Sequence, residues 1–269
     1  MINFLLQIIT ASMCVATISG NANEDKPKVS ILPAEEPVLS EDAVTLRLEL
    51  TRKRLAELAH NNPRVMKGYD DFSALLSNSF HKEKSMTAKE IEQICAAVEF
   101  AADKHRLQTR KNKDKTPYIS HPIGVAYLLM QIGENRDTSV IIGALLHDTL
   151  EDTQTIYQEL EDNFGNVAAG YVKEVTDDRT LSSNARKRMQ VVNAAHKSKG
   201  AAQIKLADKL YNLRDLLNDT PEEWSQSRID QYFEWAQSVV DRLPPANDHL
   251  QGAVKEMINQ YWEKQSDVK

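Results

Sequence analysis

The sequence contains little cysteine and has no excess of positive charge. Only Cys14 and Cys95 occur among its 269 residues, which is too few for a disulfide framework or a cysteine-based metal site. The formal net charge is −6 at pH 7, whereas nucleic-acid binders usually carry a basic surface. We therefore expect no nucleic-acid partner. The content of 41% hydrophobic and 27% charged residues is ordinary for a soluble globular protein.

The sequence also lacks internal repeats and any alternating strand pattern of useful length. Thr87 and Glu90 form a capping-box pattern, which predicts a helix through about His105. Apolar residues at helical spacing predict further helices downstream. Their approximate bounds are 122–130, 138–150, 155–163, 165–177, 183–196, 201–217, 225–242 and 246–263. The prediction is an all-α domain over residues 85–269, with its site between helices.

The first 22 residues have no Lys or Arg before a mostly apolar run that ends in small residues. Secretory signals normally begin with basic residues, and this run is too short and too polar for a stable membrane span. Two interpretations remain open for residues 1–22: a cleaved signal or membrane anchor, and an uncleaved, partly disordered extension.

Residues 23–84 are predicted to hold a linker and an accessory helix. The linker is rich in proline and acidic residues, a composition typical of flexible segments. A moderately amphipathic helix is expected over 43–60, ended by Asn61-Asn62-Pro63. Because the candidate site residues all lie after Arg106, we expect residues 1–84 to be dispensable for catalysis, unless this helix covers apolar surface of the domain.

A cluster of metal-ligand residue types follows the apolar run that ends at Leu146. The cluster consists of His147, Asp148, Glu151 and Asp152. On one helix, residues spaced by three or four lie on the same side, and charged residues are rarely buried without partners. A divalent metal would neutralise these groups and leave a carboxylate to activate water. The alternative is that the last two acids belong to an ordinary turn.

Two further positions interrupt apolar patterns with ligand-type residues. His121 precedes a proline suited to the first turn of a helix, and Asp208 lies in an apolar helical pattern with Asn212 one turn later. Imidazole and carboxylate together suit Mn, Fe or Zn. Taken singly, the histidine could cap a helix, and the aspartate could pair with Lys205 or Lys209 on the surface. The combination favours a metal site.

The order His, His-Asp, Asp resembles the HD superfamily of metal-dependent phosphohydrolases. The longer patterns His-Asp-x-x-Glu-Asp-Thr (147–153) and Leu-Ala-Asp-Lys-Leu-x-Asn-Leu-Arg-Asp-Leu (206–216) are similar to RelA/SpoT-type alarmone hydrolase domains. They are most similar to the short, hydrolase-only metazoan form. The resemblance covers about residues 89–262 and implies an HD-domain helical bundle, preceded here by a mostly disordered or helical N-terminal extension.

The resemblance also implies one Mn²⁺ ion per site. Its ligands would be His121, His147, Asp148 and Asp208. Glu151 and Asp152 match the family's acid pair and would activate water and transfer protons. Arg110 and Lys111 match cationic positions beside the site, and Asn212 matches a position that contacts the substrate.

The implied activity is hydrolysis of the 3′-pyrophosphate of guanosine tetra- or pentaphosphate, a small-molecule nucleotide substrate. Further basic residues at 186–188, 205 and 209 flank the motifs and could bind phosphate, although each is by default a solvated charge. Another phosphorylated nucleotide such as NADPH, or a non-catalytic module that senses the alarmone, remains an alternative. The family implies a cytoplasmic location, unless residues 1–22 direct secretion or membrane anchoring. The sequence carries no signal for a particular oligomeric state.

Overall fold

The computed structural model describes residues 40–83 and 85–266. Within these residues the chain forms helices and no strand, apart from an isolated bridge between Thr109 and Pro117. The prediction of an all-α fold is confirmed. The described residues belong to a single compact unit. The interpretations given to residues 1–22 and to the linker up to residue 39 lie outside the described residues.

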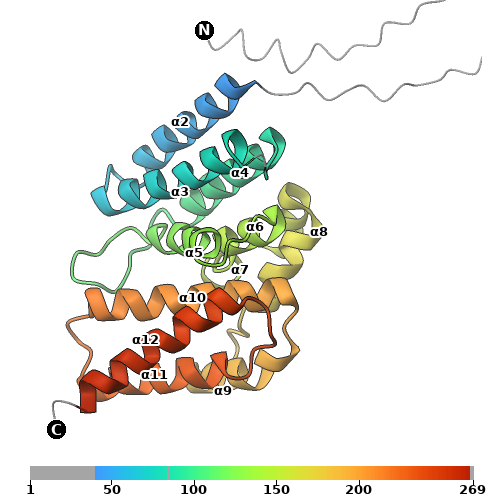
Figure 1. The fold of residues 1–269 in the computed structure, drawn as a ribbon. Coiled ribbons are helices and arrows are strands. Elements are labelled where there is room, and N and C mark those ends of the chain that lie inside the picture. The colour runs from blue at the N-terminus through green and yellow to red at the C-terminus, as the bar shows by residue number, and fades with distance from the viewer. Residues whose placement is uncertain (1–39, 84, 267–269) are drawn as a thin grey trace, which may run out of the picture. The chain divides into compact units, whose positions relative to one another are not determined.

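The helices form three groups, and helix α10 lies between the second and the third (Figure 1). Their bounds are α2 (Glu41–Leu58), α3 (Pro63–His81), α4 (Ala88–Lys104), α5 (Ser120–Gln131), α6 (Thr138–Leu146), α7 (Thr149–Asp152), α8 (Tyr157–Val175), α9 (Ser183–Asn193), the 3₁₀ turn η1 (Ala194–His196), α10 (Lys199–Asn218), α11 (Gln226–Val240) and α12 (Asp248–Ser266). Helices α2 to α4 lie at one end and α5 to α8 follow them. Helix α10 lies between that second group and the last group, α9, α11 and α12.

Helices α5, α6 and α10 pack against one another in the centre. Every residue from Val140 to Leu146 of α6 is buried, and Asp137 caps this helix by accepting hydrogen bonds from the backbone of its first turn. Gly124 of α5 allows a close approach to α10, because a Cβ atom there would lie 1.9 Å from the ring of Tyr211. These three helices position the candidate site.

The chain breaks its helix at the candidate site, where the sequence analysis predicted one helix over 138–150. Helix α6 ends at Leu146, and the single turn α7 begins at Thr149. The Thr149 hydroxyl donates to the Leu146 carbonyl over 2.7 Å, and the His147 ring lies 2.8 Å from the Ala144 carbonyl. Side chains therefore occupy carbonyls that a continuing helix would use. The prediction of one uninterrupted helix was wrong at this point.

Helix α3 was not predicted from the sequence. The Asn62 side chain accepts hydrogen bonds from the backbone N–H groups of Arg64 and Val65, and Pro63 occupies the first helical position. The motif taken as the end of the previous helix therefore also starts a new one. The capping box of Thr87 and Glu90 is present at α4 as predicted.

Helices α2 and α3 share the apolar core of the domain. Their fully or almost fully buried side chains include Val44, Leu55, Tyr69, Phe72 and Leu76. Helix α2 packs on α4, and α3 packs on α5. This packing argues against the expected dispensability of residues 1–84, while the proposed boundary at residue 85 stays a prediction.

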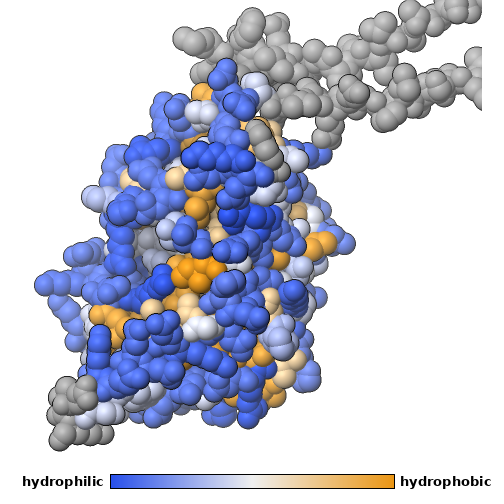
Figure 2. All heavy atoms as spheres, viewed as in Figure 1, coloured by the Kyte–Doolittle hydropathy of each residue, from blue (hydrophilic) through white to orange (hydrophobic). Residues whose placement is uncertain are grey.

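The surface in Figure 2 is mostly hydrophilic on the face shown, with separate hydrophobic patches. Exposed large apolar side chains include Leu107, in the turn after α4, and Ile156, just before α8. Among helices of the described part, none has both the length and the apolar character that a membrane span requires.

Candidate active site

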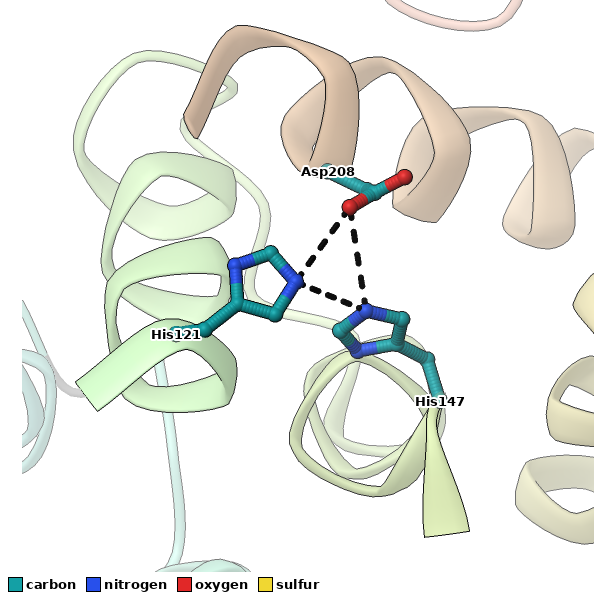
Figure 3. A group of neighbouring side chains, drawn as sticks. All are labelled: His121, His147 and Asp208. Atoms are coloured by element: carbon teal, nitrogen blue, oxygen red, sulfur yellow. Dashed lines mark hydrogen bonds and ion pairs between the residues drawn. The ribbon is translucent and has the colours of Figure 1, made fainter. Parts of the chain in front are cut away.

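His121, His147 and Asp208 meet at the centre of the domain, although they come from three separate elements (Figure 3). The two imidazole Nε2 atoms are 3.2 Å apart. Oδ1 of Asp208 is 3.3 Å from Nε2 of His121 and 3.8 Å from Nε2 of His147. All three side chains are buried. The structure therefore brings together three of the four predicted metal ligands around one point.

Asp148, the fourth predicted ligand, lies beside this group. Its Oδ2 atom is 3.1 Å from Nε2 of His147 and 3.5 Å from Nε2 of His121. The Tyr118 hydroxyl donates to the same oxygen over 2.7 Å. Two imidazole nitrogens and two carboxylate oxygens thus converge, and this donor set suits a divalent first-row metal.

The protonation of the two histidines is also compatible with a metal site. Nδ1 of His147 faces the Ala144 carbonyl, which can only accept, so this nitrogen carries a proton and directs Nε2 at the site. Burial and the nearby charge of Arg110 lower the pKa of His121 to about 4. Against the effect of burial, the Asp148 carboxylate raises the pKa of His147 to about 8. Metal ligation requires a neutral imidazole, so a cation bound here would take the place of the proton that the carboxylates favour on His147.

Asp208 uses its two oxygens differently. Oδ1 faces the histidines and also accepts a hydrogen bond from Asn212 over 2.6 Å. Oδ2 forms an ion pair with Lys209 at 3.0 Å. The alternative pairing weighed in the sequence analysis is therefore present for Lys209, but it is buried and leaves the other oxygen directed at the site. Lys205 forms no ion pair with Asp208.

Glu151 and Asp152 lie in α7, immediately after the break in the helix. Oε2 of Glu151 accepts the backbone N–H of Asp177 over 3.1 Å, and Arg179 forms an ion pair with Asp152 at 3.1 Å. Burial raises the pKa of both carboxyl groups above their ordinary values, and the Asp148 carboxylate adds to this for both. Acids with raised pKa values are suited to both accepting and donating protons near neutral pH.

A cavity of about 400 Å³ opens beside these acids. Asp152 lines it together with Arg110, Lys111 and Asn212, so the predicted substrate-binding residues are brought together with one catalytic candidate. Arg110 donates to Asn212 over 2.9 Å and to Asp215 over 2.8 Å. Lys111 is exposed at the mouth of the cavity.

Several residues that line this cavity were not among the predicted site residues. Those with polar or aromatic side chains include Tyr118, Asp215, Trp224 and Tyr232. Burial raises the pKa of Tyr232 to about 12, so its hydroxyl stays protonated. Asp215 falls within the 206–216 motif quoted for the resemblance, and that signal could have identified it. Trp224 has no comparable motif and reaches the cavity only through the fold.

The HD domain family matches residues 97–234 of the chain. The chain belongs to this family. This HD-domain protein is 51% identical over 165 residues to a Xenopus tropicalis protein named guanosine-3′,5′-bis(diphosphate) 3′-pyrophosphohydrolase MESH1, covering 61% of the present chain and 92% of the relative. A Drosophila melanogaster protein of the same name is 47% identical, with 61% and 91% coverage.

A solved structure is similar in fold as well as in sequence. It is described as "A metazoan ortholog of SpoT hydrolyzes ppGpp and plays a role in starvation responses". The TM-score is 0.61 at 45% identity, over 63% of this HD-domain protein and 95% of the other chain. The resemblance inferred from the motifs is confirmed.

Proposed function

We propose that this HD-domain protein hydrolyses the 3′-pyrophosphate of guanosine tetra- and pentaphosphate, giving GDP or GTP and pyrophosphate. The observation that carries the proposal is the position of Asp152, which belongs to the acid pair next to the metal-ligand group and also lines the cavity that holds Arg110 and Lys111. Asp152 could therefore take part in proton transfer and also contact a nucleotide bound in the cavity. The relatives' printed names support the choice of substrate.

We assign the donor cluster to one Mn²⁺ ion per site, held by His121, His147, Asp148 and Asp208. When bound, such an ion supplies Lewis acidity toward a phosphoryl oxygen and lowers the pKa of water. Tyr118 holds the Asp148 carboxylate in place through its hydroxyl.

The protein's own groups would bind the nucleotide and move protons. Arg110 and Lys111 attract the phosphates, since guanidinium and ammonium groups form charge-assisted hydrogen bonds with phosphate oxygens, and Asn212 contacts the nucleotide beside them. Glu151 and Asp152 share two tasks: one accepts a proton from the attacking water, and the other donates a proton to the departing ribose 3′ oxygen. The water oxygen ends on the released pyrophosphate.

A product assay on the full chain tests this function. Purified protein is given Mn²⁺ and either guanosine tetraphosphate or NADPH, and the products are separated by anion exchange. We expect GDP and pyrophosphate in equal amounts from the first substrate. Release of orthophosphate from NADPH, with no reaction of guanosine tetraphosphate, would establish the alternative nucleotide. Nucleotide binding with no turnover of either compound would establish a sensor.

The remaining parts of the proposal concern location and partners. We propose a cytoplasmic protein that does not bind nucleic acid, in keeping with the net charge of −6. Fractionation of cells that express the full chain, and a gel-shift assay with duplex DNA and RNA, test the two statements.

A further inference from the structure

A second cavity, of about 270 Å³, lies against α10 away from the nucleotide cavity. Its walls include Asp177, Asp178, Arg186, Gln190, Lys197 and Lys205. Three of these six side chains are cationic and two are acids, and the mechanism above uses none of the six.

Helix α10 contributes one residue to each cavity and, between them, Asp208 to the group of candidate metal ligands. Lys205 lines the second cavity, Asp208 belongs to the donor cluster, and Asn212 lines the nucleotide cavity. Residues spaced by three and four lie on one side of a helix, and the rise places them about 4.5 and 6 Å apart along its axis. A ligand with its nucleoside in the first cavity and its phosphorus at the cluster would therefore extend toward Lys205.

Lys205 is a buried lysine in the wall of this cavity. Its exposed fraction is 8%, and it forms no hydrogen bond or ion pair with any residue in the ranges 40–83 and 85–266. Burial lowers the pKa of its ammonium group from the ordinary value. The carboxylates of Asp208 and Asp177 offset part of its charge without a direct contact. A buried ammonium with no hydrogen-bond partner is still costly, so an anion that enters the cavity would gain a charge-assisted hydrogen bond with this group.

The other polar groups of the cavity are mostly engaged. Asp177 accepts a hydrogen bond from Gln190 over 2.5 Å, and Lys197 donates to the Glu174 carbonyl. Oε1 of Gln190 is buried and has no hydrogen-bond partner within the described part of the chain. Arg186 donates to the Leu181 carbonyl through one of its nitrogens. Asp178 accepts hydrogen bonds from the backbone N–H and the hydroxyl of Thr180. Both acids in this wall are thus already hydrogen-bonded, whereas Lys205 has no hydrogen-bond partner among the described residues.

We propose that Lys205 and this cavity bind the distal phosphate of the substrate's 3′-diphosphate and, after cleavage, one end of the released pyrophosphate. The proposal rests on the proposed function. The water oxygen bonds to the proximal phosphorus, the bond from that phosphorus to the ribose 3′ oxygen breaks, and this oxygen takes a proton. The distal phosphate stays on the proximal one throughout, so Lys205 contacts the same group before and after the reaction.

The test compares the affinities of inorganic pyrophosphate and orthophosphate for the full chain loaded with Mn²⁺. Lys205→Met keeps the length of the side chain and removes the charge. Lys199→Met removes one charge from the exposed start of the same helix and serves as the matched control. Metal content and melting temperature are measured on each preparation, and affinities are determined by calorimetry.

We expect Lys205→Met to weaken pyrophosphate binding about ten- to a hundredfold and to leave orthophosphate binding and metal content unchanged. Lys199→Met should leave both affinities and the metal content unchanged. The KM for guanosine tetraphosphate should rise in parallel. An unchanged ratio of the two affinities would overturn the proposal, as would a wild-type protein that binds pyrophosphate no better than orthophosphate. If Lys205→Met does not fold, Arg186→Met at the same cavity must lower the ratio, and an unchanged ratio there also overturns it.

The binding experiment separates this proposal from the proposed function. A wild-type protein that leaves guanosine tetraphosphate intact contradicts the function. The dependence of the affinity ratio on Lys205 still decides the role of the cavity in that case.

Discussion

Arg64 of α3 forms an ion pair with Asp215 of α10. The other oxygen of Asp215 binds Arg110 at 2.8 Å, and Arg110 lines the nucleotide cavity. A residue that precedes the predicted catalytic domain is therefore linked through Asp215 to a residue that lines this cavity. Because of this contact, we expect deletion of the N-terminal region to affect both stability and activity.

Deleting residues 1–84 should abolish stable folding and turnover. It would expose the surfaces of α4 and α5 that α2 and α3 cover. Each large apolar side chain contributes about 1.5–3 kcal/mol on burial, and a domain has only about 5–15 kcal/mol in total. Deletion of residues 1–39 is the control and should leave melting temperature and turnover unchanged, because the described core begins at Val44. A stable and active 85–269 fragment would contradict this expectation.

Replacing Asp208 with alanine should remove metal and activity together. The substitution takes away the carboxylate that faces both histidines, and it also leaves Lys209 buried without its partner, so a moderate loss of stability is expected. Asp208→Asn keeps a neutral partner for the lysine and separates the two effects. Metal content by mass spectrometry and turnover should fall in both variants. Full activity in Asp208→Asn would exclude a metal centre at this position.

The double substitution Glu151→Gln and Asp152→Asn should separate chemistry from binding. The amides preserve shape but cannot accept a proton, and each general acid or base typically contributes about a hundred- to ten-thousandfold in rate. We expect turnover to collapse while Mn²⁺ and nucleotide still bind, as measured by calorimetry. Loss of metal in this variant would show that the acids are ligands.

Two glycine-to-alanine substitutions should have opposite effects on stability. In Gly124→Ala the new Cβ would lie 1.9 Å from the ring of Tyr211, so the variant should lose about 1–3 kcal/mol through overpacking. In Gly252→Ala, within α12, no atom lies within 4 Å of the new Cβ, and a gain of about 0.5–1 kcal/mol is expected from the lower entropy of the unfolded chain. Urea unfolding measures both. Equal stabilities would contradict the close packing of α5 on α10.

Cys95 should resist alkylation in the folded protein. The side chain is fully buried, and burial raises the pKa of its thiol to about 11, so the reactive thiolate is scarce at pH 8. In a Cys14→Ser variant Cys95 is the only thiol. Mass spectrometry after iodoacetamide treatment should show modification in denaturant and none in buffer. Rapid modification under native conditions would show that the packing of α4 opens readily.

The sequence predicted the metal cluster better than the course of the chain around it. Residues that the structure brings together could be named from the sequence because His121 and Asp208 interrupt apolar patterns and His147 directly follows one. The break after Leu146 was not identified, because it depends on hydrogen bonds from side chains to carbonyls within the last turn. Trp224 was missed because its place at the nucleotide cavity depends on tertiary packing. Helix α3 was missed because Asn62 and Pro63 are as typical after one helix as before another.

The pairing of Arg110 with Asp215 has a consequence for the salt dependence of ligand binding. A phosphate that reaches Arg110 replaces a carboxylate on a guanidinium that is already neutralised. Ligand affinity then reflects the difference in free energy between the ion pair of Arg110 with phosphate and its ion pair with Asp215. Few mobile counterions are displaced from Arg110 in this exchange. Added salt should therefore weaken binding less steeply than the number of basic side chains around the cavity would suggest.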